Sequence, residues 1–158
     1  MRSLRLVPIL LLVMAFTAGP AVADQSQHTD RLFLSVTAAG TTAGHPELQS
    51  GQVVNTHTSG RVNFAIENYM VNGAKPDTAY VVVLLLFAGS CSGPFAFPFA
   101  TGAILATDAH GDAHGQAKIS PAQVTGFGIH NTDWGITWTL VAGGVTAYTT
   151  ACSQVHID

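Results

Sequence analysis

Hydrophobic residues form one long run in the middle of the chain and alternate with polar residues elsewhere. The run, Tyr80–Ala88, is nine apolar residues long and includes three consecutive valines. Runs rich in β-branched residues favour a largely buried strand. The run is too short to span a bilayer, which takes about 20 apolar residues. We therefore expect this strand at the centre of the fold, with shorter strands around it.

Segments in which apolar and polar residues alternate predict the other strands, because successive side chains of a strand point to opposite faces. The alternating segments are 31–38, 52–57, 61–68, 103–107, 116–120, 134–141, 145–149 and 151–157. In segment 61–68 we expect Val62, Phe64 and Ile66 to face inward and Glu67 to face outward. In segment 134–141 we expect Trp134 and Trp138 on the core face.

Glycine- and proline-rich stretches predict the connections between these strands. We expect a turn-rich connection at Gly40–Gly51, a hairpin turn at Thr58–Gly60 and another hairpin around Asp108–Gly115. Ala142–Gly144 predicts a tight turn, and Ser120-Pro121 favours a single helical turn. Seven to nine short strands joined by such turns are typical of a β-sandwich or a small barrel.

One short motif resembles a known family. Gly73–Tyr80 reads Gly-Ala-Lys-Pro-Asp-Thr-Ala-Tyr, which is similar to the Gly-x-x-Pro-x-Thr-x-Tyr entry into a strand in fibronectin type III and related immunoglobulin-like sandwiches. In that family the tyrosine forms a corner, and its hydroxyl bonds an upstream backbone group. The resemblance implies that Tyr80 is the corner residue and that Pro76-Asp77 is its turn.

The order of segments also looks like small exported bacterial β-sandwich proteins of unassigned role: a buried strand, a Cys-Ser-Gly segment and a Thr-Asp-x-x-Gly-Asp hairpin. The two resemblances imply an all-β fold, a single immunoglobulin-like antiparallel β-sandwich of 7–9 strands. They imply no function, because one fold carries many functions.

Residues 1–23 have the pattern of a secretory signal peptide. Arg2 and Arg5 supply positive charge, Leu6–Phe16 is apolar, and Ala21-Val22-Ala23 is a small-x-small cleavage site. We expect cleavage before Asp24 and a single domain over 24–158. The product would be secreted, extracellular or periplasmic, and not held in a membrane.

Cys91 and Cys152 are the only cysteines. In an oxidising compartment such a pair predicts a disulfide. A bond that closes a loop of about 60 residues should stabilise the fold by roughly 4 kcal/mol in the chain-entropy model.

Charge narrows the range of partners. Residues 24–158 hold four Lys or Arg and nine Asp or Glu, a formal charge of 4 − 9 = −5. Nucleic acids and anionic membranes bind basic patches, so neither is an expected partner. We expect a monomer without a cofactor whose partner is an unknown extracellular ligand or protein.

One cluster has the residue types of a metal site. Asp108, His110, Asp112 and His114 alternate with small residues, and carboxylate and imidazole groups bind Zn²⁺ or Cu²⁺. The alternative is a hairpin turn in which Asp and Gly serve the backbone and His is solvated. We prefer the turn, since one segment does not easily supply four ligands while it reverses direction.

No catalytic motif is complete. His130 and Asp133 could pair, but the chain has no Gly-x-Ser-x-Gly elbow. Glycosidic cleavage needs two facing acids, and of the two glutamates Glu47 is in a loop and Glu67 is expected on an outward face. The remaining histidines are expected to be exposed: His28, His45, His57 and His156.

Four phenylalanines are the candidate binding surface: Phe95, Phe97, Phe99 and Phe127. Exposed rings can stack on sugars or dock an apolar partner. Pro98 within the series predicts an edge strand or an extended loop. The alternative, which we prefer, is that the rings cap one end of the core.

The sequence thus predicts a secreted, non-catalytic module that binds through loops at one end. A metal-binding protein centred on His110 and His114 is the first alternative. A self-assembling surface protein, in which an unpaired edge at Phe95–Phe99 pairs with other copies, is the second.

Overall fold

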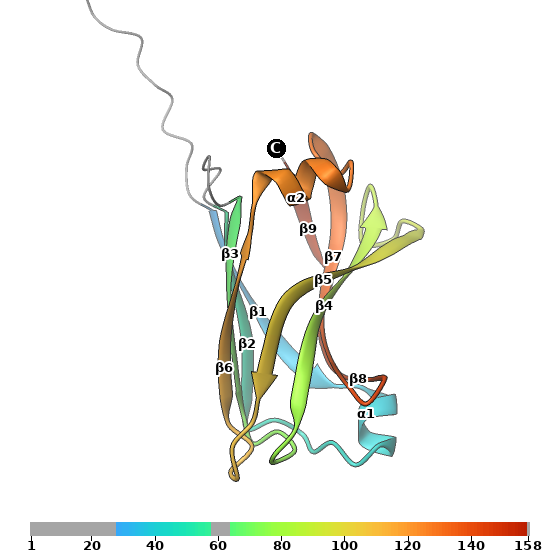
Figure 1. The fold of residues 1–158 in the computed structure, drawn as a ribbon. Helices are drawn as coiled ribbons and strands as arrows, with labels where there is room; N and C mark the ends of the chain where they lie inside the picture. The colour runs from blue at the N-terminus through green and yellow to red at the C-terminus, as the bar shows by residue number, and fades with distance from the viewer. Residues whose placement is uncertain (1–27, 58–63, 158) are drawn as a thin grey trace, which may run out of the picture.

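The computed structural model describes residues 28–57 and 64–157. The expected signal peptide, the expected turn at Thr58–Gly60 and the start of segment 61–68 lie outside the described residues. Within the described part, nine strands and two short helices follow one another (Figure 1). They are β1 (His28–Val36), α1 (Ala38–Thr42), β2 (Ser50–His57), β3 (Ala65–Asn72), β4 (Ala79–Ala88), β5 (Phe95–Ala106), β6 (Ala113–Ile119), α2 (Pro121–Gly126), β7 (Thr132–Ala142), β8 (Val145–Thr150) and β9 (Ser153–Ile157).

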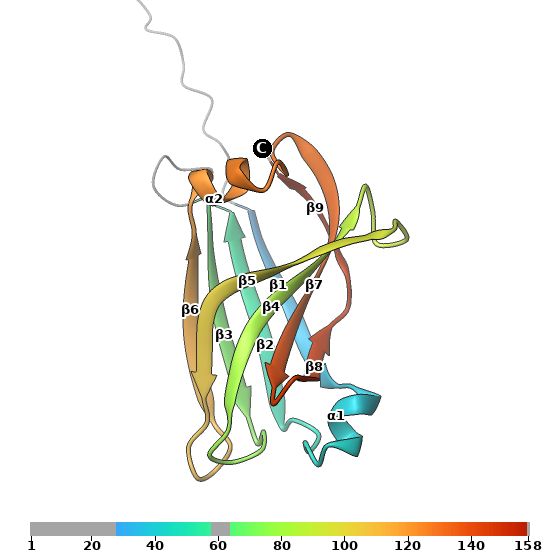
Figure 2. The same ribbon diagram turned by 45° about the vertical axis from the view of Figure 1, so that its right-hand side comes forward.

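All strand pairs are antiparallel, and the strand order is β5-β4-β7-β8-β1-β2-β3-β6, with β9 beside β7. The first part of β1 pairs with β2 and its last three residues pair with β8, so β1 joins the two halves of the sheet. The sheet curls until β5 and β6, the two ends of the order, lie side by side (Figures 1 and 2). The all-β antiparallel prediction is confirmed, and the sheet is nearly a barrel rather than two clearly separate layers.

Strand β4 lies at the centre of its half of the sheet, between β5 and β7. Tyr80, Val82, Leu84 and Leu86 point into the core and are buried. The alternate residues are half-buried or exposed, and Val81 faces solvent. The central strand is confirmed, but only one face of its apolar run is covered, because the two helices are too short to form a second layer over the outer face.

The predicted facing of the third strand is wrong. Ala65, Glu67 and Tyr69 of β3 are buried, whereas Ile66 is half-buried and lies on the outer face. Phe64 is buried just before the strand begins. The alternation could not decide which face of this strand is buried, because apolar residues occur on both faces.

Strand β5 is longer than predicted, since it unites the phenylalanine series with the expected strand at 103–107. Its register against β4 shifts so that Thr101–Ala103 lie opposite Val82, and Gly102 has φ +82° there. Such a bulge bends a strand, and β5 sweeps across the molecule towards β6 (Figure 2). The expected hairpin around Asp108–Gly115 is wrong: this segment links β5 to β6, but β5 pairs with β4 and β6 pairs with β3.

The two helices are each about one turn long. The expected turn after Ser120 is confirmed as α2, which begins with a capping box between Ser120 and Gln123. The first helix, α1, was not expected: it covers the end of the predicted strand 31–38 and the start of the predicted connection at Gly40–Gly51. Thr37 caps it, and a Cβ on Gly40 would lie 2.3 Å from the carbonyl oxygen of Ala147, so only glycine allows this helix to approach β8.

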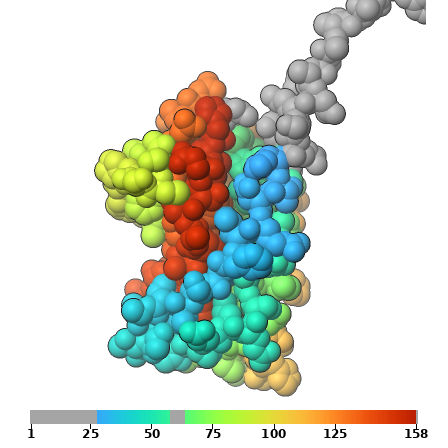
Figure 3. All heavy atoms as spheres, turned by 180° about the vertical axis from the view of Figure 1, so that it is seen from behind, coloured from blue at the N-terminus to red at the C-terminus, as the bar shows by residue number. Residues whose placement is uncertain are grey.

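The predicted disulfide is confirmed. Cys91 and Cys152 are bonded, with their Cα atoms 5.8 Å apart. The bond fastens the β4–β5 connection to the residues that precede β9. Seen from behind, the red C-terminal strands lie between this yellow-green connection and blue β1 (Figure 3). Neither described helix is long and apolar enough to cross a membrane.

Candidate functional site

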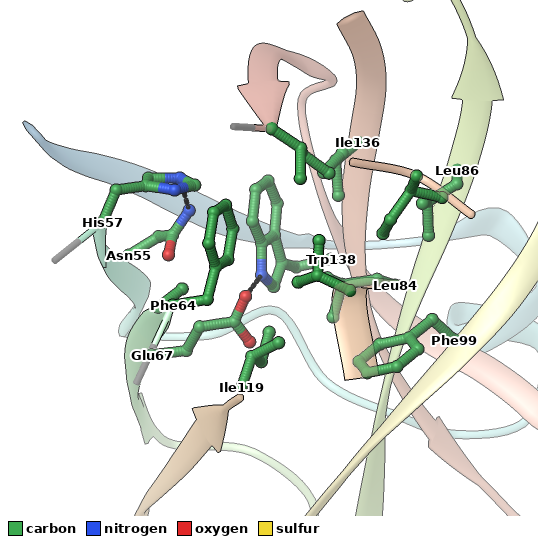
Figure 4. Close-up of a pocket in the computed structure, with 14 residues that line it drawn as sticks. Asn55, His57, Phe64, Glu67, Leu84, Leu86, Phe99, Ile119, Ile136 and Trp138 are labelled. Atoms are coloured by element: carbon green, nitrogen blue, oxygen red, sulfur yellow. Dashed lines mark hydrogen bonds between the residues drawn. The ribbon is translucent and has the colours of Figure 1, made fainter. Parts of the chain in front are cut away.

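A cavity lies inside the barrel (Figure 4), and part of its wall is Val124 of α2, the helix that covers this end of the barrel (Figure 1). Its volume is ≈ 40 Å³, room for about three water-sized spheres. Most of its wall is apolar and comes from eight different elements or their flanks. The lining residues are Asn55, His57, Phe64, Ala65, Glu67, Leu84, Leu86, Phe99, Ile119, Val124, Ile129, Ile136, Trp138 and Ile157.

A carboxyl group forms part of this wall. Glu67 of β3 is only 1% exposed. The indole Nε1 of Trp138 donates to its Oε1 at 2.9 Å, and the hydroxyl of Tyr69 donates to its Oε2. Period-two alternation places Glu67 and Tyr69 on the same inner face of β3, and Trp138 reaches Glu67 from β7 (Figure 4). One acid is thus held by two strands that are far apart in the sequence.

Burial changes the acid–base properties of this group. Removal from water raises the pKa of Glu67 to about 7, although the hydrogen bonds from Tyr69 and Trp138 oppose the rise. The pKa of Tyr69 is raised as well, first by burial and then by the charge of Glu67. Tyr69 therefore stays protonated and remains a donor throughout the neutral range.

Asn55 lies directly opposite Glu67 in the β2–β3 register. Residues in this relation have side chains on the same face, with Cβ atoms about 5 Å apart. Asn55 is 2% exposed, and its Nδ2 lies 2.8 Å from Nε2 of His57. Its Oδ1 is buried and has no hydrogen-bond partner among the described residues. A buried amide oxygen without a donor is uncommon, and this one stands beside a carboxyl at a cavity.

Three of the four predicted binding phenylalanines meet at this end. Phe99 is buried and lines the cavity, and the ring of Phe127 packs edge-on against it with centroids 5.0 Å apart. Phe127 is 49% exposed and stacks on Phe97. Phe97 in turn contacts Trp134. We call Phe97, Phe127 and Trp134 the aromatic rim.

Phe95 lies apart from the aromatic rim. It is exposed, and its ring contacts Phe87 of β4. The preferred interpretation of the series as core capping therefore describes Phe99, whereas Phe95 and Phe127 keep large exposed surfaces.

Both aspartates of the predicted metal site bond backbone groups with their side chains. Oδ1 of Asp108 accepts from the backbone N–H groups of His110 and Asp112, and Oδ1 of Asp112 accepts from that of Gly73. His110 and His114 are exposed. Over residues 28–57 and 64–157, no three His, Cys, Asp or Glu side chains gather as a metal-binding group. Metal binding by these four residues stays a prediction.

The histidines partly depart from expectation. His130 is exposed, and the partner of Asp133 is His156, at 2.8 Å. His28 and His156 are exposed as expected, and His57 is half-buried. The expected exposure of His45 is wrong. It is buried against α1 and β8, because α1 turns the segment that carries it back onto the barrel.

His45 belongs to a second buried polar cluster, at the α1 end. Its Nδ1 lies 3.0 Å from the hydroxyl of Tyr80, and the hydroxyl of Tyr148 donates to the carbonyl oxygen of Pro46 at 3.0 Å. Burial lowers the pKa of His45, and the charge of Lys75 lowers it further. The expected corner residue, Tyr80, thus has the ring of His45 as the hydrogen-bond partner of its hydroxyl, rather than an upstream backbone group.

No protein-family model, curated protein or solved structure matches this chain. The resemblance to fibronectin type III domains therefore has no support from these comparisons. The α2-end cavity must be interpreted from its own geometry.

Sequence reasoning missed the two polar groups of this cavity. Glu67 was placed on the wrong face, and Asn55 was not singled out. One signal was available: charged residues are only 9% of the chain, so a glutamate within a half-apolar strand was unusual. The register that sets Asn55 opposite Glu67 could not be obtained from either strand alone.

Proposed function

We propose that the chain is an exported, non-catalytic binding protein that takes one end of a small ligand into a cavity at the α2 end of its barrel. The observation that carries the proposal is the cavity in which Glu67 and Asn55 stand side by side in an apolar wall. Apolar pockets with a few convergent polar groups and an acid of perturbed pKa are the usual form of small-molecule sites.

The polar groups favour a binding role over simple packing. A buried acid costs free energy that an apolar residue of similar size would not. The amide oxygen of Asn55 adds a second cost, because it has no donor among the described residues. A ligand that bonds to these groups would offset both costs when it binds.

The aromatic rim extends the site beyond the cavity. Phe127 contacts Phe99, which lines the cavity, and also presents half of its surface to solvent. A volume of ≈ 40 Å³ holds only a ligand's end group, so the remainder of the ligand would lie against these rings. This arrangement agrees with the expectation that loops at one end make the contact.

We also propose a fold type and a cellular compartment for the protein. The halves β1-β2-β3-β6 and β5-β4-β7-β8 resemble two sheets that share β1, so we interpret the near-barrel as a variant of the immunoglobulin-like sandwich. The disulfide supports an oxidising compartment, which agrees with export through a signal peptide at residues 1–23.

Binding of three-carbon probes tests the function. We expect n-propylammonium, n-propanol or both to shift the indole resonance of Trp138 at millimolar concentration. With four non-hydrogen atoms at no more than about 1.5 kcal/mol each, tighter binding than tens of micromolar is out of reach.

A matched pair of variants locates the site. Ala65→Leu would fill the cavity that Ala65 lines, whereas Ala96→Leu adds the same atoms at an exposed position. We expect the first to abolish the shift and the second to leave it unchanged. A wild-type protein that binds neither probe, or an Ala65→Leu variant that binds as well as wild type, would contradict the proposal.

A further inference from the structure

We infer that the group received by the cavity is a small alkylammonium, held by the carboxylate of Glu67 and the amide oxygen of Asn55. The inference deepens the proposed function and rests on it, because it assigns a chemical class to the ligand of the same site. Four observations lead to it: the spare hydrogen-bonding capacity, the placement of the two acceptors, the missing counter-charge and the aromatic wall.

Glu67 and Asn55 can both accept further hydrogen bonds. Each carboxylate oxygen of Glu67 has one donor from the protein and retains a further lone pair. Oδ1 of Asn55 is buried and accepts no hydrogen bond from residues 28–57 or 64–157. The donors nearby are occupied, since Trp138 and Tyr69 donate to Glu67. A group that complements this wall must therefore donate hydrogen bonds.

The two acceptors are neighbours across one ladder. Asn55 and Glu67 are register partners on adjacent antiparallel strands, and both side chains are buried at the cavity. One small group with several N–H bonds can bond to both at once. An ammonium has three donors and no acceptor, whereas a hydroxyl has a single donor.

The acid has no cationic partner within the described part of the chain. Arg31, Lys75 and Lys118 are all exposed, and no Lys or Arg is among the residues that line the cavity. A buried carboxylate is stabilised most by an opposite charge within a few ångströms. An ammonium supplied by a ligand would take that place.

The rest of the wall suits an alkylated cation. Phe64, Phe99 and Trp138 present aromatic rings to the cavity (Figure 4). Aromatic faces attract ammonium groups and also accept the alkyl carbons next to them. A carboxylate end group, by contrast, would meet Glu67 with like charge.

The titratable groups that face Glu67 give the pH dependence its sign. They are Tyr69 on β3 and His57 on β2, because β4, β5, β6, α2, β7 and β9 contribute no titratable side chain to the cavity wall. Glu67 has a pKa of about 7, so it is largely ionised at pH 8 and protonated at pH 5.5. Acidification therefore weakens ammonium binding as Glu67 takes up its proton.

Calorimetric or NMR titration with three matched probes tests the inference. The probes are n-propylammonium, n-propanol and propionate, applied to the full chain at pH 8 and pH 5.5. At pH 8 we expect n-propylammonium to bind about tenfold more tightly than n-propanol, because a charge-assisted hydrogen bond adds about that much affinity over a neutral one. We expect this preference to disappear at pH 5.5, and propionate not to bind.

Two glutamine variants assign the preference to one carboxylate. Glu67→Gln keeps the shape of the side chain and should abolish the preference for n-propylammonium. Glu47→Gln removes the same charge from an exposed position and should retain it. If Glu67→Gln does not fold, the pH dependence of the wild type decides in its place.

The outcomes separate the inference from the function on which it rests. Equal binding of n-propylammonium and n-propanol at pH 8, or an unchanged preference in folded Glu67→Gln, overturns the ammonium assignment and leaves the binding function standing. Failure of both n-propylammonium and n-propanol to bind overturns both, whether or not propionate binds.

Discussion

The two ends of the barrel bury polar groups in different ways. At the α1 end, the ring Nδ1 of His45 is hydrogen-bonded to the hydroxyl of Tyr80. The hydroxyl of Tyr148 donates to the backbone carbonyl of Pro46, the residue after His45. At the α2 end, Glu67 is hydrogen-bonded as well, but the neighbouring Asn55 has an acceptor without a donor in the described part of the chain, and a cavity lies beside it. Burial of polar side chains alone therefore does not mark a site. The proposed site differs in its spare hydrogen-bonding capacity and in the cavity beside it.

The ends also respond to pH in opposite directions. Burial lowers the pKa of His45, so the folded state resists protonation and the α1 end loses stability as pH falls below 6.5. Burial raises the pKa of Glu67, so the folded state resists ionisation and the α2 end loses stability as pH rises towards 7. Variants that separate these two effects test the comparison.

The largest expected effect comes from the disulfide, which we expect to support the α2 end selectively. The double variant Cys91→Ser, Cys152→Ser should lower the free energy of unfolding by about 4 kcal/mol, because it frees a loop of 61 residues. Urea unfolding measures the loss. Hydrogen exchange should accelerate more in β9, which follows Cys152, than in β1. Equal acceleration in both strands would contradict the selective role.

Glu67 should make stability fall with rising pH. The unfolded chain releases this proton near pH 4.5 and the folded chain near pH 7. The contribution of Glu67 to the free energy of unfolding is therefore largest below pH 4.5 and is lost as the pH rises to about 7. The difference amounts to about 3 kcal/mol. Glu67→Gln should remove this loss, so that its advantage over wild type grows between pH 4.5 and pH 8 in denaturant titrations. Parallel pH profiles of the two proteins would show that the acid is not buried as described.

A matched pair of tyrosine variants compares the ends directly. Tyr69→Phe removes a donor to a buried carboxylate and should cost about 2 kcal/mol at pH 8, whereas Tyr148→Phe removes a donor to the Pro46 carbonyl and should cost about 1 kcal/mol. Only the cost of Tyr69→Phe should shrink at pH 5, where Glu67 is neutral. Thermal unfolding at both pH values measures this, and a pH-dependent cost for Tyr148→Phe would reverse the assignment.

The smallest expected effect concerns the aromatic rim. Phe127 and Phe95 are both about half exposed, so Phe127→Ala and Phe95→Ala should each cost only about 1 kcal/mol. Only Phe127 contacts a ring that lines the cavity. A long-chain amine such as n-hexylammonium should therefore bind less tightly to Phe127→Ala and equally well to Phe95→Ala. Equal losses would remove the aromatic rim from the site.

Features that depend on local sequence could be predicted. The buried run at β4, the alternation in β7, the glycine turn before β8 and the capped turn of α2 follow from residue periods and turn residues. The Cys91–Cys152 bond followed from the cysteine count. These signals need no knowledge of the partner strand.

Features that depend on partners could not be predicted. The facing of β3 was predicted wrongly because apolar residues occur on both of its faces, so the pattern did not decide which way Glu67 points. The burial of His45 depends on α1, whose close approach to β8 rests on Gly40. The closure of the sheet depends on β1 changing partners along its length. The site belongs to this second group, since the positions of Asn55, Glu67 and Trp138 come from three strands.

Chemical-shift mapping during titration of the full chain with n-propylammonium at pH 8 tests the central claim most directly. We predict shifts at the indole N–H of Trp138, the side-chain amide of Asn55 and the backbone of Val124, with none at His45 or Tyr148. Shifts centred on His45 and Tyr148, or no shifts up to saturating concentrations, would contradict the account.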